Sequence, residues 1–278
     1  MSRTQLEATT AYYRTVPAVG LLRLAMGFLQ RLWPALAVRA ASRLFLTPLP
    51  PKWLARGTSW SADWTVSPLP FEDAAVTLYE HGGAGPVVLL AHGWGGHAGQ
   101  MKTLAAALVA AGLRPIIMEM PAHGRSAGLQ SNLPQFARAI DYVVARLAEN
   151  GRPVQALVAH SLGASAAAFA TARNLPVGRL VLVAPAASPP AYTRMFAHIV
   201  GLSERTRAAM PGRAPVGIDD RVEFLQDLLE ARQQLRGRIA HLGLRRAKVG
   251  DPQAGSLVET VTQGLGEQIV GGAAAGSG

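Results

Sequence analysis

The chain has 278 residues, of which 49% are hydrophobic and 16% charged, so it is long and apolar enough to bury a large globular core. It contains no cysteine, which excludes disulfides and thiolate metal sites, and its His, Asp and Glu residues show no metal-ligand spacing. The formal net charge is +10, but no interleaved aromatic and basic platform accompanies it. We therefore expect no metal, no cofactor and no nucleic-acid partner.

Most of the excess charge lies in residues 1–60, where Glu7 is the single acid. From Ala18 to Leu46 the chain is apolar with regularly spaced arginines, and Pro34 interrupts it, which predicts two short helices. The uncharged stretches, about seven residues long, are shorter than the roughly 20 residues that span a bilayer, and no secretory signal pattern precedes them. Two interpretations stay open: a helical pair packed on the sheet edge or over the site, or a basic segment lying on anionic lipid.

Beyond residue 60, short apolar strands alternate with helices. This alternation predicts right-handed βαβ units and a mainly parallel sheet with helices on both faces, in which functional residues collect at the carboxyl ends of the strands. We expect strands over Pro86–His92, Leu113–Met120, Val154–Val158 and Arg179–Pro185, and helices over Gln100–Ala111, Pro134–Asn150 and Gly163–Arg173.

Each of three glycine-containing motifs lies at a predicted strand end. They are His92-Gly-Trp-Gly-Gly96, Pro121-Ala-His-Gly-Arg-Ser126 and Ala159-His-Ser-Leu-Gly163. A serine on a tight strand-to-helix turn needs small neighbours because the backbone is strained, and the turn lifts its hydroxyl clear of the chain. A glycine-rich corner after a strand exposes backbone N–H groups, as an oxyanion site requires.

In this order and at these intervals, over roughly Ala74 to Met210, the motifs resemble the α/β-hydrolase superfamily, and within it bacterial esterase- or lipase-like members. The resemblance implies an α/β-hydrolase fold in which Ser161 is the nucleophile and the backbone N–H groups of Trp94 and Leu162 form the oxyanion hole. It also implies hydrolysis of a small acyl or ester substrate through an acyl-serine intermediate.

Four histidines of this region are expected to serve structure rather than chemistry. By the same resemblance, His92 braces the oxyanion loop and His123 packs in its turn. His160 points into the sheet or the helix layer, and His198 lies on an apolar helix of the predicted lid.

The acid and the histidine that such an enzyme needs after its serine are not apparent in the sequence. In relatives the histidine sits in a turn resembling Gly-Leu-Gly-His, and here Gly264-Leu-Gly-Glu267 places Glu267 where the base would stand. His241 follows His198 and is a candidate base, but it lies on a predicted helix over Val222–Arg246, where a preceding acid would be badly placed. A shifted reading frame or truncation, a non-hydrolytic binding protein and a rewired base such as Glu267 all stay open.

The expected organisation is a helical extension over residues 1–60, an α/β-hydrolase domain over 61–270 and a flexible tail over 271–278. The domain includes a lid at about 187–215 and an atypical part from about 211. Because an uncovered edge strand at Leu180 would expose backbone groups, either the Val222–Arg246 helix covers it or the region beyond Pro211 is poorly ordered. We expect a cytoplasmic protein, with residues 18–46 as the segment that would contact the inner face of a membrane.

Overall fold

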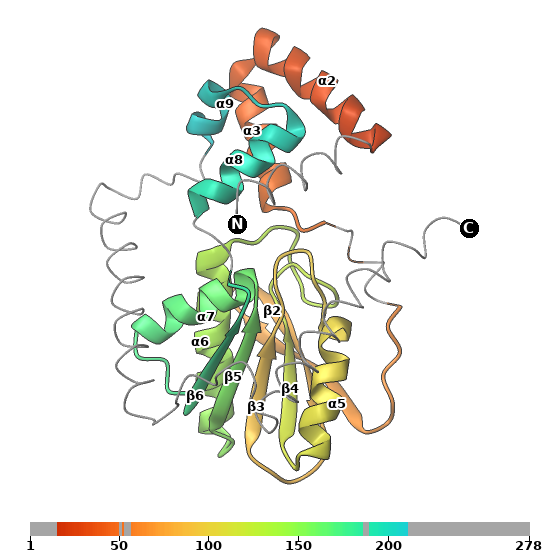
Figure 1. The fold of residues 1–278 in the computed structure, drawn as a ribbon, viewed down its shortest axis with the longest axis vertical. Coiled ribbons are helices and arrows are strands. Elements are labelled where there is room, and N and C mark those ends of the chain that lie inside the picture. The colour runs from red at the N-terminus through yellow and green to blue at the C-terminus, as the bar shows by residue number, and fades with distance from the viewer. Residues whose placement is uncertain (1–15, 50–51, 53–56, 186–188, 211–278) are drawn as a thin grey trace, which may run out of the picture.

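The computed structural model describes residues 16–49, 52, 57–185 and 189–210. Within these residues one mixed sheet has the strand order β1-β2-β4-β3-β5-β6 (Figure 1). Strands β4, β3, β5 and β6 run parallel, whereas β1 and β2 form an antiparallel pair against β4. The strands are β1 (Trp64–Phe71), β2 (Ala74–His81), β3 (Val87–Ala91), β4 (Arg114–Glu119), β5 (Val154–His160) and β6 (Arg179–Val183).

The four predicted strands are confirmed, and two further strands were missed. Strand β1 contains Pro68 and Pro70, which lack a backbone N–H and interrupt a strand pattern in the sequence. It can hold them because, among the described residues, it is an outer strand that pairs with β2 alone. The order of the parallel strands confirms the predicted α/β-hydrolase architecture.

Helices cover both faces of the sheet, as predicted. Helix α5 (Lys102–Ala110), preceded by the short 3₁₀ helix η1 (Ala98–Met101), packs on one face, where Ala105 is fully buried against Leu90 and its neighbours. Helices α6 (Leu133–Glu149) and α7 (Leu162–Ala172) pack on the other face.

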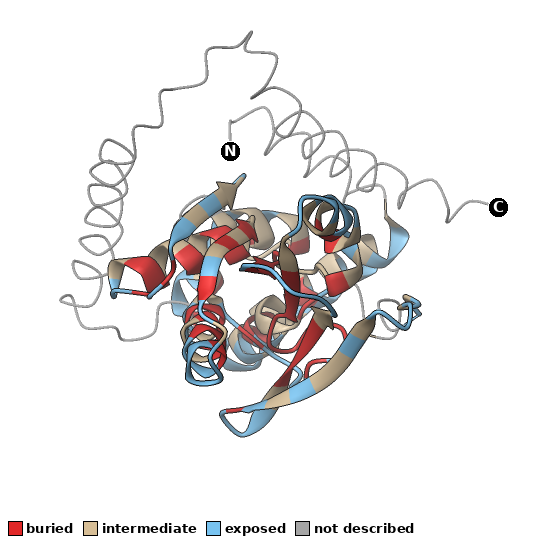
Figure 2. Cartoon of the chain, turned by 90° about the horizontal axis from the view of Figure 1, so that it is seen from below, coloured by how far each residue is buried: buried red, intermediate tan, exposed pale blue. Residues whose placement is uncertain are grey.

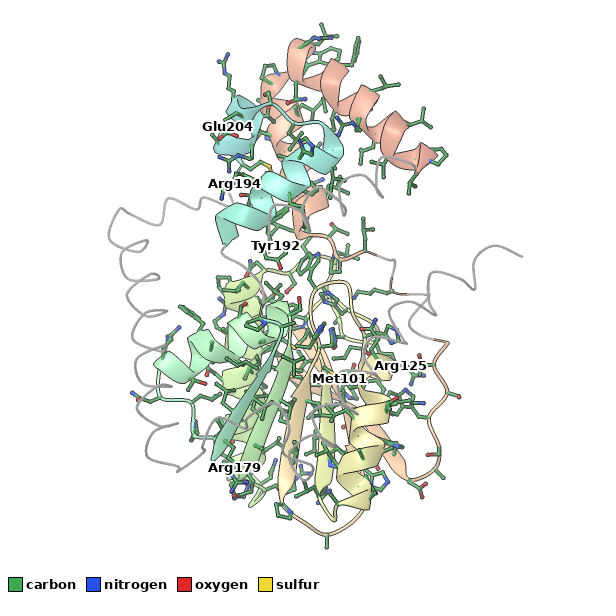
Figure 3. The ribbon with its side chains drawn as sticks, in the orientation of Figure 1. Met101, Arg125, Arg179, Tyr192, Arg194 and Glu204 are labelled. Atoms are coloured by element: carbon green, nitrogen blue, oxygen red, sulfur yellow. The ribbon has the colours of Figure 1, made fainter. Side chains whose placement is uncertain are left out.

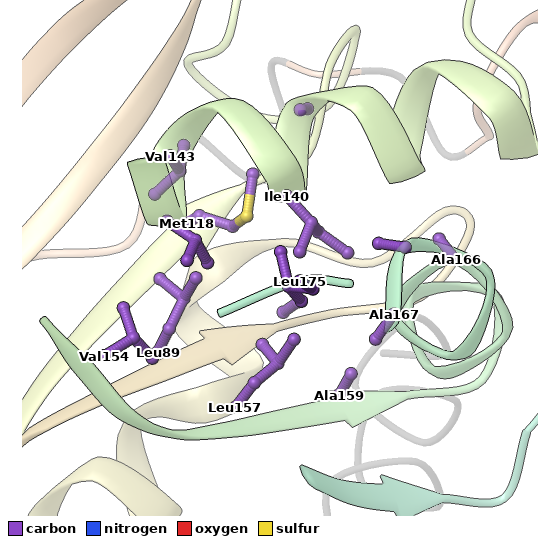
Figure 4. Packing of buried hydrophobic residues seen from close by; sticks show 14 of the residues in the cluster. Leu89, Met118, Ile140, Val143, Val154, Leu157, Ala159, Ala166, Ala167 and Leu175 are labelled. Atoms are coloured by element: carbon purple, nitrogen blue, oxygen red, sulfur yellow. The ribbon is translucent and has the colours of Figure 1, made fainter. Parts of the chain in front are cut away.

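The core between the sheet and helices α6 and α7 combines large and small side chains (Figure 4). Leu157 and Ala159 of β5 face Ala166 and Ala167 of α7, and all four are fully buried. Since alanine adds little bulk, α7 approaches the sheet closely. The helix that follows Ser161 is thereby placed directly against the strand that precedes it.

Among the described residues, helices α2, α3, α8 and α9 form a cap beyond the carboxyl ends of the parallel strands (Figure 1). In Figure 3, Arg194 and Glu204 of the cap lie at the opposite end of the molecule from Arg179, where β6 begins. The cap helices are α2 (Pro17–Leu32), α3 (Pro34–Leu46), α8 (Pro189–Val200) and α9 (Glu204–Ala209).

The N-terminal helices α2 and α3 pack on helices α8 and α9. Arg23 of α2 donates to the carbonyl of Ile199 at 2.8 Å, and Gln30 donates to the carbonyl of Gly201 at 3.1 Å. The rings of Phe45 and Phe196 meet edge to face with centroids 5.1 Å apart. The helices α2 and α3 and the helices α8 and α9, far apart in the sequence, therefore form one helical layer.

The cap is joined to the sheet domain through the chain that follows β4. The N–H of Ser131 donates to the carbonyl of Leu46 at 2.9 Å, and the Gln130 side chain donates to the carbonyl of Arg43 at 3.2 Å. Lys52 donates to the carbonyl of Ser126 at 2.6 Å. The last turn of α3 and Lys52 beyond it are thus attached to the loop that carries the Pro121–Ser126 motif.

Strand β6 is the outer parallel strand, and among the described residues no strand pairs with its free edge. Val181 on it is 47% exposed, whereas the central strands lie in the buried interior (Figure 2). The helix predicted over Val222–Arg246, the strand candidate Val258–Thr262 and the predicted tail lie outside the described residues. In the described part of the chain, no helix combines the length and the apolar character needed to cross a membrane.

Asp141 of α6 is half-buried, and this burial raises the pKa of its carboxyl to about 6, against an opposing contribution from Arg173. The folded state therefore holds this proton up to a higher pH than the unfolded chain does, and stability is lost as the pH rises through about 6. We expect Asp141→Asn to raise the free energy of unfolding at pH 8 by about 1 kcal/mol, a value reduced for partial exposure, and to give no gain at pH 4.

Urea unfolding of both proteins at the two pH values measures this difference. Asp63→Asn, at an exposed carboxylate ahead of β1, is the matched control and should change stability little at either pH. If Asp141→Asn changed the free energy of unfolding equally at the two pH values, this result would contradict the raised pKa of Asp141.

Candidate active site

Ser161 occupies the turn between β5 and α7 with φ 52° and ψ −119°, a backbone conformation that L-residues seldom adopt. Its N–H donates to the carbonyl of Val183 at the end of β6 at 2.9 Å, and its carbonyl accepts from the N–H of Ser165 at 3.1 Å. These bonds hold the strained residue between a strand end and the first turn of a helix. Such retained strain is typical of functional positions.

Two glycines allow the chain to approach Ser161 closely. A Cβ atom on Gly93 would lie 2.8 Å from the Cβ of Ser161, and one on Gly163 would lie 2.4 Å from the carbonyl oxygen of His92. Neither distance is possible for a real side chain. The loop after β3 and the turn after β5 are therefore in direct backbone contact.

Two backbone donors flank the serine. Leu162 is the first residue of α7, so helix geometry leaves its N–H without an intrahelical acceptor. Trp94 directly follows Gly93, the residue in contact with Ser161. Within the part of the chain that the structure describes, neither N–H donates to a protein acceptor, and the Ser161 hydroxyl has no hydrogen-bond partner.

His92 is buried at the base of the first motif. Its Nδ1 donates to the carbonyl of Gly93 at 2.8 Å, and its Nε2 accepts from the N–H of Met120 at 3.1 Å. A nitrogen that accepts from an N–H carries no proton, so the ring is neutral with its hydrogen on Nδ1. Burial lowers the pKa of His92 to about 4, which keeps this form at neutral pH.

His123 is bonded in the same way. Its Nδ1 donates to the carbonyl of Pro121 at 2.9 Å, and its Nε2 accepts from the N–H of Gly95 at 3.0 Å. Burial, together with His92, lowers its pKa to about 3. Both rings thus connect the Gly93–Gly96 loop to the chain after β4, and neither has a nitrogen free to accept a proton from Ser161.

Glu119, which sequence reasoning did not single out, adds a third connection. Its carboxylate accepts from the hydroxyl of Tyr79 at 2.6 Å and from the N–H groups of Ala98 and Arg125, each at 2.9 Å. Gly124 leaves room for it, because a Cβ there would lie 2.0 Å from a carboxylate oxygen. A single acid near the end of a mostly apolar predicted strand was the signal available in the sequence.

Ser126, at the end of the second motif, fixes that motif to the sheet. Its hydroxyl donates to the carbonyl of Glu119 at 2.6 Å and accepts from the N–H of Thr77 at 2.8 Å. Glu119 and Ser126 together tie strands β2 and β4 to the segment that follows β3 and to the loop that follows β4.

The remaining candidate residues do not complete a triad in the described structure. His160 is half-buried, which lowers its pKa, and His198 lies on α8 in the cap. Among the described residues, no histidine nitrogen is hydrogen-bonded to the hydroxyl of Ser161. His241 and Glu267 lie outside the described residues, so their positions stay untested.

The three motifs fall within a match to a known family. The family model described as serine aminopeptidase, S33, matches residues 83–237. The match runs past Met210, where the sequence resemblance was expected to end, and stops before His241 and Glu267. No curated protein matches the chain significantly.

Several solved structures resemble the chain at low identity. A predicted CIB-like hydrolase from Thermoplasma acidophilum is 16% identical, with 49% of this chain and 82% of that one covered and a TM-score of 0.39. The esterase Pf2001 from Pyrococcus furiosus is 17% identical, with 46% and 55% covered and a TM-score of 0.42. A putative lipase from Acinetobacter baumannii AYE is 19% identical, with 63% and 67% covered and a TM-score of 0.41. The match spans little more than half of the esterase.

The family match covers more than half of the chain and contains every motif that surrounds the strained serine. The mixed, mostly parallel sheet with helices on both faces has the architecture expected of that family. The chain therefore belongs to the S33 serine aminopeptidase family of the α/β-hydrolase superfamily.

Proposed function

We propose that this protein is a serine hydrolase that cleaves carboxylic esters through an acyl-Ser161 intermediate. The observation that carries the proposal is the strained turn of Ser161, which touches Gly93 just ahead of Trp94 and leads directly into α7 at Leu162. Among the described residues, the Ser161 hydroxyl and the N–H groups of Trp94 and Leu162 have no hydrogen-bond partner. A nucleophile and two preorganised donors at one point are what acyl transfer requires.

In the proposed reaction the Ser161 oxygen attacks the ester carbonyl while its proton passes to a general base. The carbonyl oxygen becomes an oxyanion and accepts hydrogen bonds from the N–H groups of Trp94 and Leu162. Because Leu162 begins α7, the partial positive charge of the helix N-terminus adds to this stabilisation. The alcohol leaves with the proton from the base, and water then hydrolyses the acyl-enzyme by the same steps.

We assign the general base and its acid to the chain beyond Met210. His92 and His123 are excluded as bases because both nitrogens of each ring are already hydrogen-bonded. His241 is the candidate imidazole of the remaining chain, and Glu267 is the candidate for a rewired base. The loop-bracing histidines then act by holding the oxyanion donors in place.

A second candidate is a binding protein that uses the same scaffold without catalysis. It is favoured by one observation: in the described residues, no histidine nitrogen is hydrogen-bonded to the Ser161 hydroxyl. Without a positioned base a serine hydroxyl is a poor nucleophile. The two candidates differ in whether acyl groups are transferred to Ser161.

A substrate panel tests the proposal. The full chain is incubated with p-nitrophenyl butyrate, an aminoacyl p-nitroanilide and styrene oxide, which probe ester, amide and epoxide cleavage. We expect saturable ester hydrolysis at least about 10-fold faster than anilide cleavage, because an alcohol leaves an acyl-serine site more readily than an amine, and no epoxide opening.

Faster turnover of the anilide or of the epoxide would contradict ester hydrolysis as the function. No turnover of any substrate, combined with no reaction with a fluorophosphonate, would favour the binding protein.

A further inference from the structure

The outward side of helix α2 is apolar over its whole length. Leu21, Leu24, Phe28 and Leu32 recur at intervals of three and four residues and so share one side of the helix. Trp33 and Leu36 continue this side into α3, and the Trp33 ring lies edge-on to Phe28 at 6.4 Å between centroids. These six residues, here called the apolar face, are each between 50% and 74% exposed.

The orientation of the apolar face follows from the opposite side of the same helix. There Met26 is buried, and Arg23 and Gln30 donate to carbonyl groups at the end of α8 and in the turn that follows. The polar contacts of α2 thus point into the cap, and its apolar side chains point away from the protein. In Figure 1, α2 lies at the end of the molecule farthest from the sheet.

Exposed arginines flank the apolar face. Arg31 lies beside it on α2, and Arg39 and Arg43 continue the exposed side of α3 beyond Leu36. Among the described residues none of the three is paired with a carboxylate. The sequence contains no acidic residue between Glu7 and Asp63, so the flanking charge is entirely positive.

We propose that the apolar face is a docking surface for an anionic lipid bilayer. In this arrangement α2 lies in the plane of the interface, its leucines and Phe28 enter the acyl region, and the arginines contact lipid phosphates. Trp33 lies at the boundary, which indole side chains favour. A second copy of the chain fits the surface less well, because it would bring a like set of arginines against these.

Docking through this face has a consequence for the rest of the molecule. The cap lies at the carboxyl end of the parallel strands, the end at which Ser161 is found. A bilayer bound to α2 therefore lies on the Ser161 side of the sheet. The docking itself requires no catalysis, so it can be tested whether or not the ester hydrolase proposal holds.

Vesicle co-sedimentation tests the docking. The full chain is mixed with vesicles of phosphatidylcholine containing about 30% phosphatidylserine or with phosphatidylcholine alone. We expect at least about 10-fold tighter binding to the anionic vesicles, and loss of most of that difference when salt is raised from about 0.1 M to 0.5 M, because exposed charges are screened.

Two variants separate the apolar and the charged contributions. Leu24→Glu with Phe28→Glu should abolish binding to both vesicle types, and Arg31→Glu with Arg39→Glu should reduce only the preference for anionic lipid. Leu129→Glu, at a leucine that is 80% exposed outside the apolar face, is the matched control and should bind as the wild type does. Circular dichroism verifies that each variant is folded.

Equal binding of the wild-type chain to the two vesicle types, or no binding to either, would overturn the proposal without any variant being needed. A dimer in light scattering that Phe28→Glu dissociates would also overturn it, because a second copy would then cover the face.

Discussion

Ser161→Ala is expected to lower kcat/KM for p-nitrophenyl butyrate by at least about 10³-fold. The hydroxyl is the only group of the proposed mechanism that forms a covalent bond with the acyl group, and removal of a nucleophile in such sites costs several orders of magnitude. The variant should keep the stability of the wild type, because alanine bears the same backbone strain and the Ser161 hydroxyl has no described hydrogen bond to lose.

Steady-state kinetics and thermal unfolding of the same preparation measure both parts of this prediction. Ser165→Ala is the matched control, since it removes a hydroxyl one turn later on α7 and should leave the rate within about twofold. Equal loss of activity in the two variants would show that the helix, and not the hydroxyl of Ser161, is what the reaction needs.

Gly163→Ala is expected to lower the free energy of unfolding by about 3 kcal/mol or more. A methyl group there would lie 2.4 Å from the carbonyl oxygen of His92 and 3.1 Å from that of Ala91. Both obstacles are backbone atoms at the end of β3 and the start of the loop that follows, so α7 must move away from the sheet, and overpacking of this kind is destabilising. The same movement would draw Ser161 away from Trp94, so the folded fraction should also lose ester hydrolysis.

Gly27→Ala provides the comparison, because Gly27 also lies inside a helix but has no atom within 4 Å of the position that a methyl group would take. It should raise stability by up to about 1 kcal/mol through helix propensity alone. Urea unfolding followed by circular dichroism compares the two variants. Similar stability changes in both would contradict the close contact between α7 and the loop after β3.

The parallel core was predictable because buried parallel strands appear as uninterrupted apolar runs and their helices as periodic ones. Strand β1 was missed because Pro68 and Pro70 interrupt the strand pattern, and its partner β2, which contains no proline, was missed with it. The packing of α2 on α8 was not predictable either. A helix pattern shows which side of a helix is apolar, but it does not show which distant segment covers it.

The positions of Ser161 and its neighbours in the turn followed from local sequence, because a strained strand-to-helix turn requires small residues at fixed offsets. The role of Glu119 did not, since it depends on three donors that come from strand β2, the start of η1 and the loop after β4. The hydrogen bonds that fix the neutral form of His92 and His123 likewise depend on the fold. One bond of each ring joins segments about 30 residues apart, and the other goes to a neighbouring carbonyl that only the fold brings into place. His241 and Glu267 stay predictions.

The most direct test of the central claim is to map the site at which a fluorophosphonate reacts. The reagent phosphonylates an activated serine oxygen with loss of fluoride, so it tests the nucleophile without assuming any natural substrate. After reaction of the full chain, digestion and mass spectrometry should find one adduct, on Ser161, and none in the Ser161→Ala variant. An adduct on another residue, or no adduct on a folded wild-type chain, would contradict Ser161 as the nucleophile.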